Sequence, residues 1–250
     1  MQNEKIGLFD SGLGGLSILK TLVEVLPNEN YLFYEDSIHN PYGEKSEEEL
    51  LEITSSIVEY LLSKKCKIIV IACNTATTSC MKKLREKYPD TIFVGTVPAI
   101  KVACDHDFKN TVVLSTPYTS KSTRVNELIE CFQKEEQDIT IVSGSNLAHL
   151  IEIEDKEKIR KLLTDKLSKY QSSMDSIVLG CTHYSLIKEE FQNLFPNVTL
   201  LDGCLGVSLE VKRQLENKKL LNLSKKKGTI TIENSKSKDL ITRSYEFLER

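Results

Sequence analysis

One segment, Ile68–Ala72, constrains the fold more than any other part of this chain. Its side chains are all apolar, with no alternation between apolar and polar residues. A short run of this kind is typical of a strand that is buried on both faces, as in a parallel sheet covered by helices. The residues that follow, Thr75–Tyr88, have helical spacing, so the strand is expected to run directly into a helix.

Short apolar runs and longer helical patterns alternate along the rest of the chain. Ser46–Leu62 is the clearest helix, because Ser46 and Glu49 fit a capping box at its start. This alternation predicts an α/β fold, in which mainly parallel sheets are flanked by helices. Further elements are expected at Ile6–Phe9, Leu16–Leu26, Tyr31–Tyr34, Ile92–Val94, Val112–Leu114, Ile139–Val142, Ile177–Leu179, Val198–Leu201, Thr229–Glu233 and Lys238–Leu248.

Two parts of the chain resemble one another. Ile69–Thr75 and Ile177–His183 are both an apolar strand, a small residue, a cysteine and then polar residues that open a helix. The repeat predicts two pseudo-symmetric lobes with the active site in the cleft between them, since ligands bind at the carboxyl ends of parallel strands. We expect an N-terminal lobe at residues 1–97 that is completed by a returning segment, 207–250, and a second lobe at residues 98–206.

Charge and cysteine content exclude several classes of protein. The net charge of −3 offers no basic excess for nucleic acid or a membrane surface, and no stretch reaches the length of a membrane span. The seven cysteines include no C-x-x-C pair, so a structural zinc site is not expected. The polar start of the chain does not resemble a secretory signal, and we therefore expect a cytoplasmic protein with free thiols.

Cys73 and Cys181 are the strongest candidates for chemistry. Each is expected at the end of a strand beside a helix N-terminus, where the helix dipole favours a thiolate. Two thiols in facing lobes could remove a proton from one side of a carbon atom and deliver one to the other. Three alternatives stay open on spacing alone: inert buried cysteines, a disulfide-exchange pair, and a zinc site that includes His183.

Polar residues near the other strand ends are less specific. Gly12–Gly15 follow the first strand but lack the spacing of a dinucleotide fingerprint, so they predict either a small anion site or a plain tight turn. Asp10 could orient a base or cap a helix. His183 could exchange a proton with the thiol or fill a core position, and Glu152 could be an ordinary surface helix residue.

Five segments together resemble the glutamate racemases of the cofactor-independent aspartate/glutamate racemase superfamily. The pair formed by the first and last segments is highly specific, whereas the cysteine segments alone point only to the superfamily. The segments stand in the family's order at Gly7–Ser17, Asn40–Gly43, Ala72–Thr77, Gly95–Ile100 and Leu179–Tyr184.

The resemblance implies racemisation of glutamate by two bases without a cofactor or metal. By the family pattern, Cys73 takes the proton from D-glutamate and Cys181 takes it from L-glutamate. Asp10 would assist Cys73, and Glu152 with His183 would assist Cys181. The substrate contacts implied by the family are Asp10, Ser11, Pro41, Tyr42, Gly43, Asn74, Thr75, Thr116, Thr119, Thr182 and His183.

The chain departs from the family pattern at a few positions. His39 stands where an arginine is frequent, Ser185 where a proline follows the last motif, and Val125 near a usual tyrosine. Ser143–His149 lacks the usual Cys-Pro, which makes the assignment of Glu152 depend on fewer matched residues. None of these changes removes a proposed catalytic group.

The sequence therefore predicts a cytoplasmic glutamate racemase that supplies D-glutamate for peptidoglycan and forms a homodimer by family resemblance. Two alternatives are a racemase for aspartate or another acidic amino acid, and a non-catalytic amino-acid-binding protein. A zinc-dependent hydrolase is a more distant one. Cys66, Cys80, Cys104, Cys131 and Cys204 are expected to be packing residues.

Overall fold

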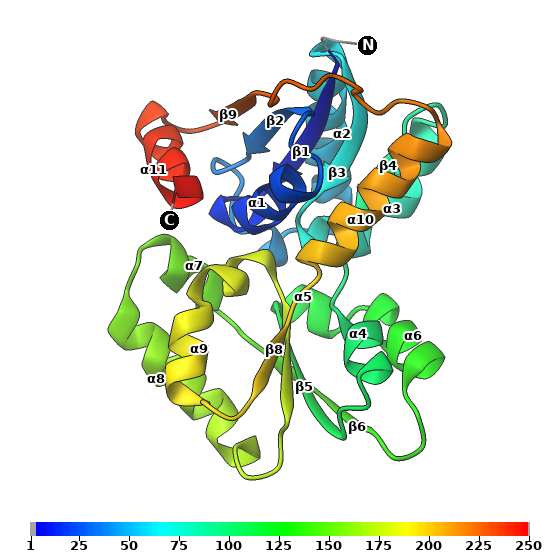
Figure 1. Cartoon of the computed structure of the whole chain (residues 1–250). Coiled ribbons are helices and arrows are strands. Elements are labelled where there is room, and N and C mark those ends of the chain that lie inside the picture. Colours follow the sequence, from blue (N-terminus) through cyan, green and yellow to red (C-terminus); the bar gives the residue numbers. More distant parts are fainter. Residues whose placement is uncertain (1–3, 250) are drawn as a thin grey trace. The chain divides into compact units, whose positions relative to one another are not determined.

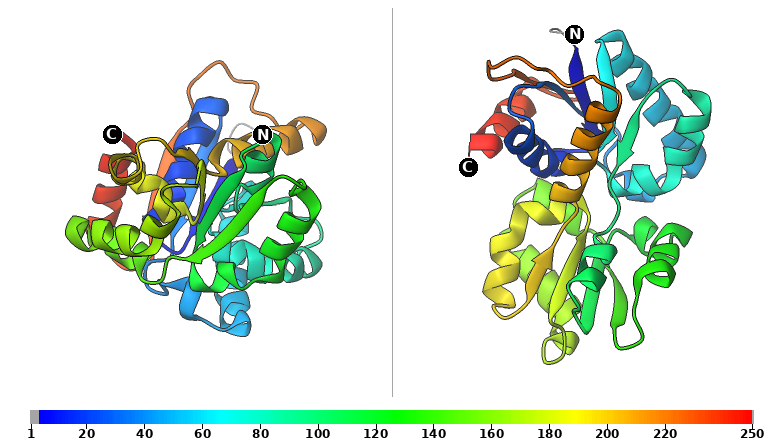
Figure 2. Two further views of the ribbon diagram at one scale, coloured as in Figure 1. Left: turned by 90° about the horizontal axis from the view of Figure 1, so that it is seen from below. Right: turned by 45° about the vertical axis from the view of Figure 1, so that its right-hand side comes forward.

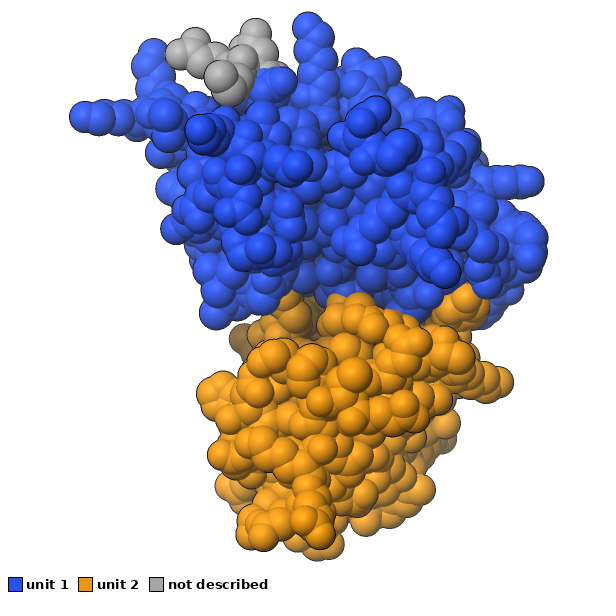
Figure 3. Space-filling view, turned by 90° about the vertical axis from the view of Figure 1, so that its right-hand side faces the viewer, with its two compact units in different colours: residues 1–96, 204–250 blue, residues 97–203 orange. Residues whose placement is uncertain are grey.

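The computed structural model describes residues 4–249, which form two compact units (Figures 1 and 3). Unit 1 comprises the residues up to 96 and those from 204 onward, and unit 2 comprises Val97–Gly203. No helix within residues 4–249 combines the length and apolar character needed to cross a membrane.

Unit 1 contains a five-stranded parallel sheet in the order β4-β3-β1-β2-β9. The last strand comes from the C-terminal segment and pairs with β2, so the end of the chain completes the first sheet (Figure 1). The strands are β1 (Lys5–Asp10), β2 (Asn30–Glu35), β3 (Cys66–Ile71), β4 (Phe93–Gly95) and β9 (Ile230–Asn234).

Helices cover both faces of this sheet (Figure 2). The helices α2 and α3 pack together on one face, and α1 packs with α10 and α11 on the other. The Ser46–Glu49 capping box is present and starts α2, as its sequence pattern predicts. The helical elements are η1 (Leu13–Gly15), α1 (Leu16–Val25), η2 (Tyr42–Glu44), α2 (Glu47–Ser63), α3 (Asn74–Lys87), α10 (Cys204–Asn217) and α11 (Lys238–Glu249).

The two partners of a buried ion pair also bind the backbone of the returning C-terminal segment within unit 1. Lys67 Nζ lies 2.7 Å from Glu29 Oε2, and both side chains are almost fully buried. The same lysine donates to the carbonyl of Leu220, and Glu29 Oε1 accepts from the backbone N–H of Asn222. Loss of either charge would leave the other buried without an opposite charge, which is strongly destabilising.

Unit 2 contains a four-stranded parallel sheet in the order β6-β5-β7-β8. Its strands are β5 (Asn110–Ser115), β6 (Asp138–Ser143), β7 (Ser176–Gly180) and β8 (Thr199–Leu201). Its helical elements are α4 (Ile100–Asp105), α5 (Pro117–Ser120), α6 (Thr123–Phe132), α7 (Leu147–Glu152), α8 (Lys156–Leu167), η3 (Ser168–Tyr170), η4 (Thr182–Ile187) and α9 (Lys188–Leu194).

The central strands of unit 2 show why continuous apolar runs predict this architecture. Ile177 and Leu179 of β7 pack into one core with α7, α8 and α9. Val178, between them, points to the opposite face and packs into a second core with α4 and α6. Successive side chains of a strand point to opposite faces, so a strand covered on both sides must be apolar throughout. The predicted fold class, two mainly parallel sheets flanked by helices, is confirmed.

Candidate active site

Polar residues gather at the carboxyl edge of the unit 1 sheet. Asp10 ends β1, Asp36 follows β2 and Cys73 follows β3 closely. These three strands are parallel neighbours with β1 at the centre, so the three residues lie along one edge. This edge is where parallel sheets bind ligands.

Asp10 is fully buried at the centre of that edge. Its Oδ1 accepts a hydrogen bond of 2.7 Å from the backbone N–H of Ser11. A Cβ added at Gly15 would lie 2.9 Å from the Asp10 Cβ and 2.7 Å from the Phe33 ring. Gly15 therefore allows the turn to approach this aspartate closely. Asp10 does not cap a helix, because the N-cap positions of η1 and α1 are Gly12 and Gly15.

Cys73 is the N-cap residue of α3 and is 6% exposed. A thiol at the N-terminus of a helix of this length lies in the positive end of the helix dipole. The next two residues, Asn74 and Thr75, are buried in the first turn. Asn74 Oδ1 has no hydrogen-bond partner within residues 4–249, so a buried acceptor beside the thiol is available to a ligand.

Tyr42 belongs to the same region of unit 1 and is held by a buried carboxylate. Its hydroxyl donates a hydrogen bond of 2.7 Å to Asp36 Oδ2. Burial raises the pKa of Tyr42 well above 10, and the negative charges of Asp36, Cys73 and Asp10 raise it further. Tyr42 is therefore a neutral hydrogen-bond donor. Of its neighbours, Pro41 is exposed and Gly43 is half-buried.

Unit 2 presents Cys181 at the end of β7, 6% exposed. The structure differs here from the sequence prediction, because the element that Cys181 caps is the 3-10 helix η4 and not an α-helix. The α-helix α9 begins only at Lys188. The helix dipole therefore stabilises a thiolate less at Cys181 than at Cys73. Neighbouring side chains must supply more of the polar environment of Cys181.

Two successive polar contacts connect the Cys181 thiol to His183 and then to Glu152. His183 Nδ1 lies 3.8 Å from Cys181 Sγ, and His183 Nε2 lies 2.7 Å from Glu152 Oε1. Glu152 is the last residue of α7, so its carboxylate reaches the histidine from a different helix. His183 is 2% exposed and is enclosed between these two partners.

The contacts with Cys181 and Glu152 favour the charged form of His183. Burial alone would lower the pKa of His183, but its hydrogen bonds and charge interactions with Cys181 and Glu152 raise the pKa well above 6.5. An imidazolium donates from both ring nitrogens, to the sulfur on one side and the carboxylate on the other. It can therefore stabilise a thiolate or return a proton to it.

The other residues predicted in unit 2 lie near the same sheet edge. Thr116 caps α5, and its hydroxyl accepts from the backbone N–H of Thr119 and donates to the Thr119 hydroxyl. Thr182, which separates Cys181 from His183 in the sequence, is buried. Tyr184, to which no role is assigned by the sequence, donates to the carbonyl of Gly144 at 3.1 Å.

Sequence reasoning missed Asp36 and Ser115. Asp36 directly follows β2, the strand beside β1. Its position at a strand end, like those of Asp10 and Cys73, is the sequence signal that could have identified it. Ser115 ends β5 and carries a buried hydroxyl without a hydrogen-bond partner in residues 4–249. It stands beside Gly180, where an added Cβ would lie 2.8 Å from the Ser115 Cβ.

The remaining cysteines divide into buried and exposed. Cys66, Cys80, Cys104 and Cys204 are buried, and burial raises the pKa of the Cys66 thiol to about 11. The prediction that Cys131 is a packing residue is wrong, because it lies exposed on α6. The helical spacing of α6 places its apolar face at Val125 and Leu128, and Cys131 falls outside it. Across residues 4–249, no group of three or more His, Cys, Asp or Glu side chains is placed to hold a metal ion.

Comparison with known proteins agrees with these features. The model of the Asp/Glu/Hydantoin racemase family matches residues 15–205. A glutamate racemase of Clostridium botulinum is 40% identical over 254 residues, which cover 99% of this chain and 98% of the relative.

Solved structures give the same result. A glutamate racemase isoform of Bacillus anthracis, 23% identical, shares the fold with a TM-score of 0.88 over 100% of this chain and 96% of its own. A Francisella tularensis glutamate racemase in complex with D-glutamate is 25% identical, with a TM-score of 0.85 over 100% of this chain and 95% of its own. The sequence resemblance is thus confirmed, and the chain belongs to the Asp/Glu/Hydantoin racemase family of enzymes.

Proposed function

We propose that this chain interconverts L- and D-glutamate without a cofactor, with Cys73 and Cys181 as the two bases. The observation that carries the proposal is a buried thiol at the carboxyl end of a strand in each unit, each with polar groups around it. The full-length relatives bear the name glutamate racemase, and one solved relative holds D-glutamate.

The proposed reaction is a proton exchange at Cα. With L-glutamate, the Cys181 thiolate takes the Cα proton, and the electron pair of the broken C–H bond stays on the substrate as a carbanion. The Cys73 thiol then delivers its proton to the opposite face, which gives D-glutamate and leaves Cys73 as the thiolate. D-glutamate reacts in the reverse sense, so two successive opposite turnovers restore the starting protonation states.

Each thiol has its own assisting groups in this proposal. Asp10 assists Cys73. His183, held by Glu152, assists Cys181, because an imidazolium 3.8 Å from the sulfur favours negative charge there. Since Cα of an amino acid is a very weak acid, the carbanion also needs preorganised N–H and O–H donors aimed at the substrate carboxylate.

The substrate contacts in the proposal come from both units. Ser11, Asn74 and Thr75 lie at the ends of β1 and β3, and Tyr42 with Gly43 lies in η2. The free Asn74 Oδ1 is suited to accept from the substrate ammonium group. In unit 2 the proposed contacts are Thr116, Thr119, Thr182 and His183.

We further propose that the protein supplies D-glutamate for peptidoglycan and acts in the cytoplasm as a homodimer. The mechanism requires free thiols, which a reducing compartment maintains. Light scattering on the purified protein is expected to give about twice the chain mass of 28.3 kDa. A mass of one chain at assay concentration would contradict the dimer.

Proton exchange with solvent tests the activity directly. The purified protein is incubated with L-glutamate in D₂O without added cofactor, while circular dichroism follows the optical activity and mass spectrometry follows deuterium at Cα. We expect racemisation together with deuterium incorporation. A parallel incubation with L-aspartate distinguishes a racemase of another acidic amino acid.

Single cysteine variants test the two bases. Cys73→Ser and Cys181→Ser are expected to lose several orders of magnitude in turnover, because a hydroxyl is a far weaker acid than a thiol. Cys131→Ser is the matched control, since Cys131 is exposed on α6 and should leave the rate unchanged. Full racemisation by either active-site variant would remove that cysteine from the proposal.

A further inference from the structure

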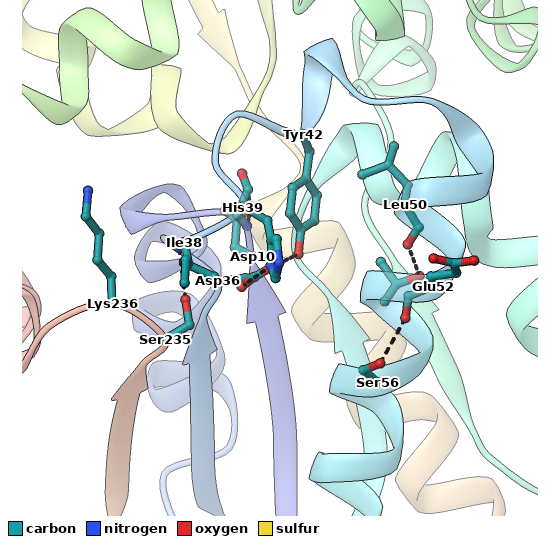
Figure 4. Close-up of polar contacts among 12 residues, drawn as sticks. Asp10, Asp36, Ile38, His39, Tyr42, Leu50, Glu52, Ser56, Ser235 and Lys236 are labelled. Carbon is teal, nitrogen blue, oxygen red and sulfur yellow. Dashed lines mark hydrogen bonds and ion pairs between the residues drawn. The ribbon is translucent and has the colours of Figure 1, made fainter.

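We propose that Asp36 is a positioning residue that fixes Tyr42, and through it the segment Pro41–Gly43, for substrate binding. The inference rests on the proposed function and adds a residue that the two-base scheme does not include. Figure 4 shows contacts from the Asp36 carboxylate to the Tyr42 hydroxyl and to the His39 ring.

The geometry makes Asp36 the centre of a small network. Tyr42 Oη donates to Asp36 Oδ2 at 2.7 Å, and His39 Nδ1 lies 2.9 Å and 2.8 Å from Oδ1 and Oδ2. Asp36 and Tyr42 are each 1% exposed, whereas the His39 side chain is 43% exposed. The carboxylate is therefore held by one buried and one partly exposed partner, and both of them contact Oδ2.

The backbone around Asp36 is tied to two strands. The Asp36 N–H donates to the Asp10 carbonyl at 2.8 Å, which links it to the end of β1. On the other side, the Ile38 N–H donates to Ser235 Oγ, and Asn234 Nδ2 donates to Ser37 Oγ. The returning strand β9 thus braces the loop that carries Asp36. A carboxylate on a braced loop has a fixed position from which to orient a side chain.

The bond with Asp36 also determines what Tyr42 can do. A tyrosine hydroxyl has one proton to donate, and here it goes to Asp36. The ring is consequently locked in one orientation, where it packs in the same core cluster as Cys73 and Phe9. Loss of the carboxylate would release the ring and leave a buried hydroxyl without its acceptor.

A double-mutant cycle tests this inference. kcat and KM are measured for wild type, Asp36→Ala, Tyr42→Phe and the double variant, with D-glutamate affinity measured by calorimetry in parallel. We expect each single variant to lose about 10- to 100-fold in kcat/KM, the range for a lost hydrogen bond to a charged group. The double variant should lose no more than the worse single variant, because the two residues act as one unit.

Two further variants separate positioning from general damage. Asp36→Asn keeps an acceptor for the Tyr42 hydroxyl and should recover most of the activity that Asp36→Ala loses. Tyr60→Phe is the matched control, because it removes another tyrosine–carboxylate hydrogen bond of unit 1, that of Tyr60 with Glu233. It should leave kcat/KM and glutamate affinity unchanged.

The outcomes are distinguishable from failure of the proposed function. An active wild type with unchanged Asp36→Ala overturns the role of Asp36 and leaves the racemase proposal intact. Losses that multiply in the double variant, or equal losses in Asp36→Asn and Asp36→Ala, overturn the link to Tyr42. If the wild type binds glutamate but does not racemise it, the affinities still decide the role of Asp36. A wild type that does neither overturns both proposals.

Discussion

Glu152 Oε1 and His183 Nε2 lie 2.7 Å apart although 31 residues separate them in the sequence. The carboxylate comes from the last residue of α7, and the imidazole comes from the turn after β7. This contact keeps the histidine oriented toward Cys181. The interactions of His183 with Cys181 and Glu152 raise the pKa of the histidine.

Glu152→Gln should slow the reaction by about 10- to 100-fold, because an amide cannot support the imidazolium as a carboxylate does. The two enantiomers have equal free energy, so kcat/KM must fall by the same factor in both directions. The pKa of His183 should fall as well, and the alkaline limit of activity should move to lower pH. Rates measured in both directions between pH 6 and 10 check this.

A matched control variant shows whether that effect is specific to Glu152. Glu154→Gln changes an exposed carboxylate two residues further along the chain and should leave the pH profile unchanged. An unaltered profile in Glu152→Gln would show that the carboxylate does not act through His183.

The raised pKa of His183 also predicts a pH-dependent contribution to stability. The folded state binds the His183 proton more tightly than the unfolded chain does, in which histidine titrates near 6.5. The contribution is therefore fully present below about pH 6.5 and is lost as the pH rises through the higher folded-state value. Urea unfolding of wild type and His183→Asn should differ most near pH 6 and converge at alkaline pH. A difference that grows with pH would contradict the assigned direction.

Two glycines should respond in opposite ways to alanine. At Gly180 an added Cβ would lie 2.8 Å from Ser115 Cβ and 2.9 Å from the Leu114 carbonyl oxygen, so Gly180→Ala must shift backbone next to Cys181. We expect lower stability and lower kcat. Gly206 lies in α10 with nothing within 4 Å of the added atom, and Gly206→Ala should stabilise the protein by about 0.5–1 kcal/mol. Chemical unfolding measures both, and a stabilised, fully active Gly180→Ala would contradict the close packing.

The cysteines should separate by accessibility and acidity. Cys131 is exposed and should react readily with iodoacetamide in the native protein at pH 8. Cys66 should remain unmodified, because it is buried and burial raises its pKa to about 11. Mass spectrometry of the digested protein gives the order of labelling. Protection of Cys131 in the native protein, lost on denaturation, would show that this face of α6 is covered.

The fold was largely predictable because its strands are covered on both faces. Ile68–Ala72 must be apolar throughout in such a sheet, and this run locates β3 (Cys66–Ile71) within two residues. The polar residue types at strand ends also place Asp10 and Cys73 along one edge. These properties depend on local sequence, which is why the sequence shows them.

The contacts between side chains were less predictable. The sequence contains an aspartate after β2, but only the path of the following loop brings the Tyr42 hydroxyl back to it. Likewise, nothing local to Cys181 shows that the element after it is a 3-10 helix. The pairing of Glu152 with His183 depends on where α7 ends relative to β7, a property of the folded unit. Family resemblance suggested that pair, and spacing alone left it undetermined.

The returning strand β9 also affects how the chain is made. A ribosome completes residues 97–203 before it reaches Ile230, so all four strands of unit 2 are available while the sheet of unit 1 still lacks its last strand. Until β9 emerges, the outer edge of β2 has unpaired N–H and carbonyl groups. The nascent protein therefore carries an open sheet edge through most of translation, and a chain released early would keep it.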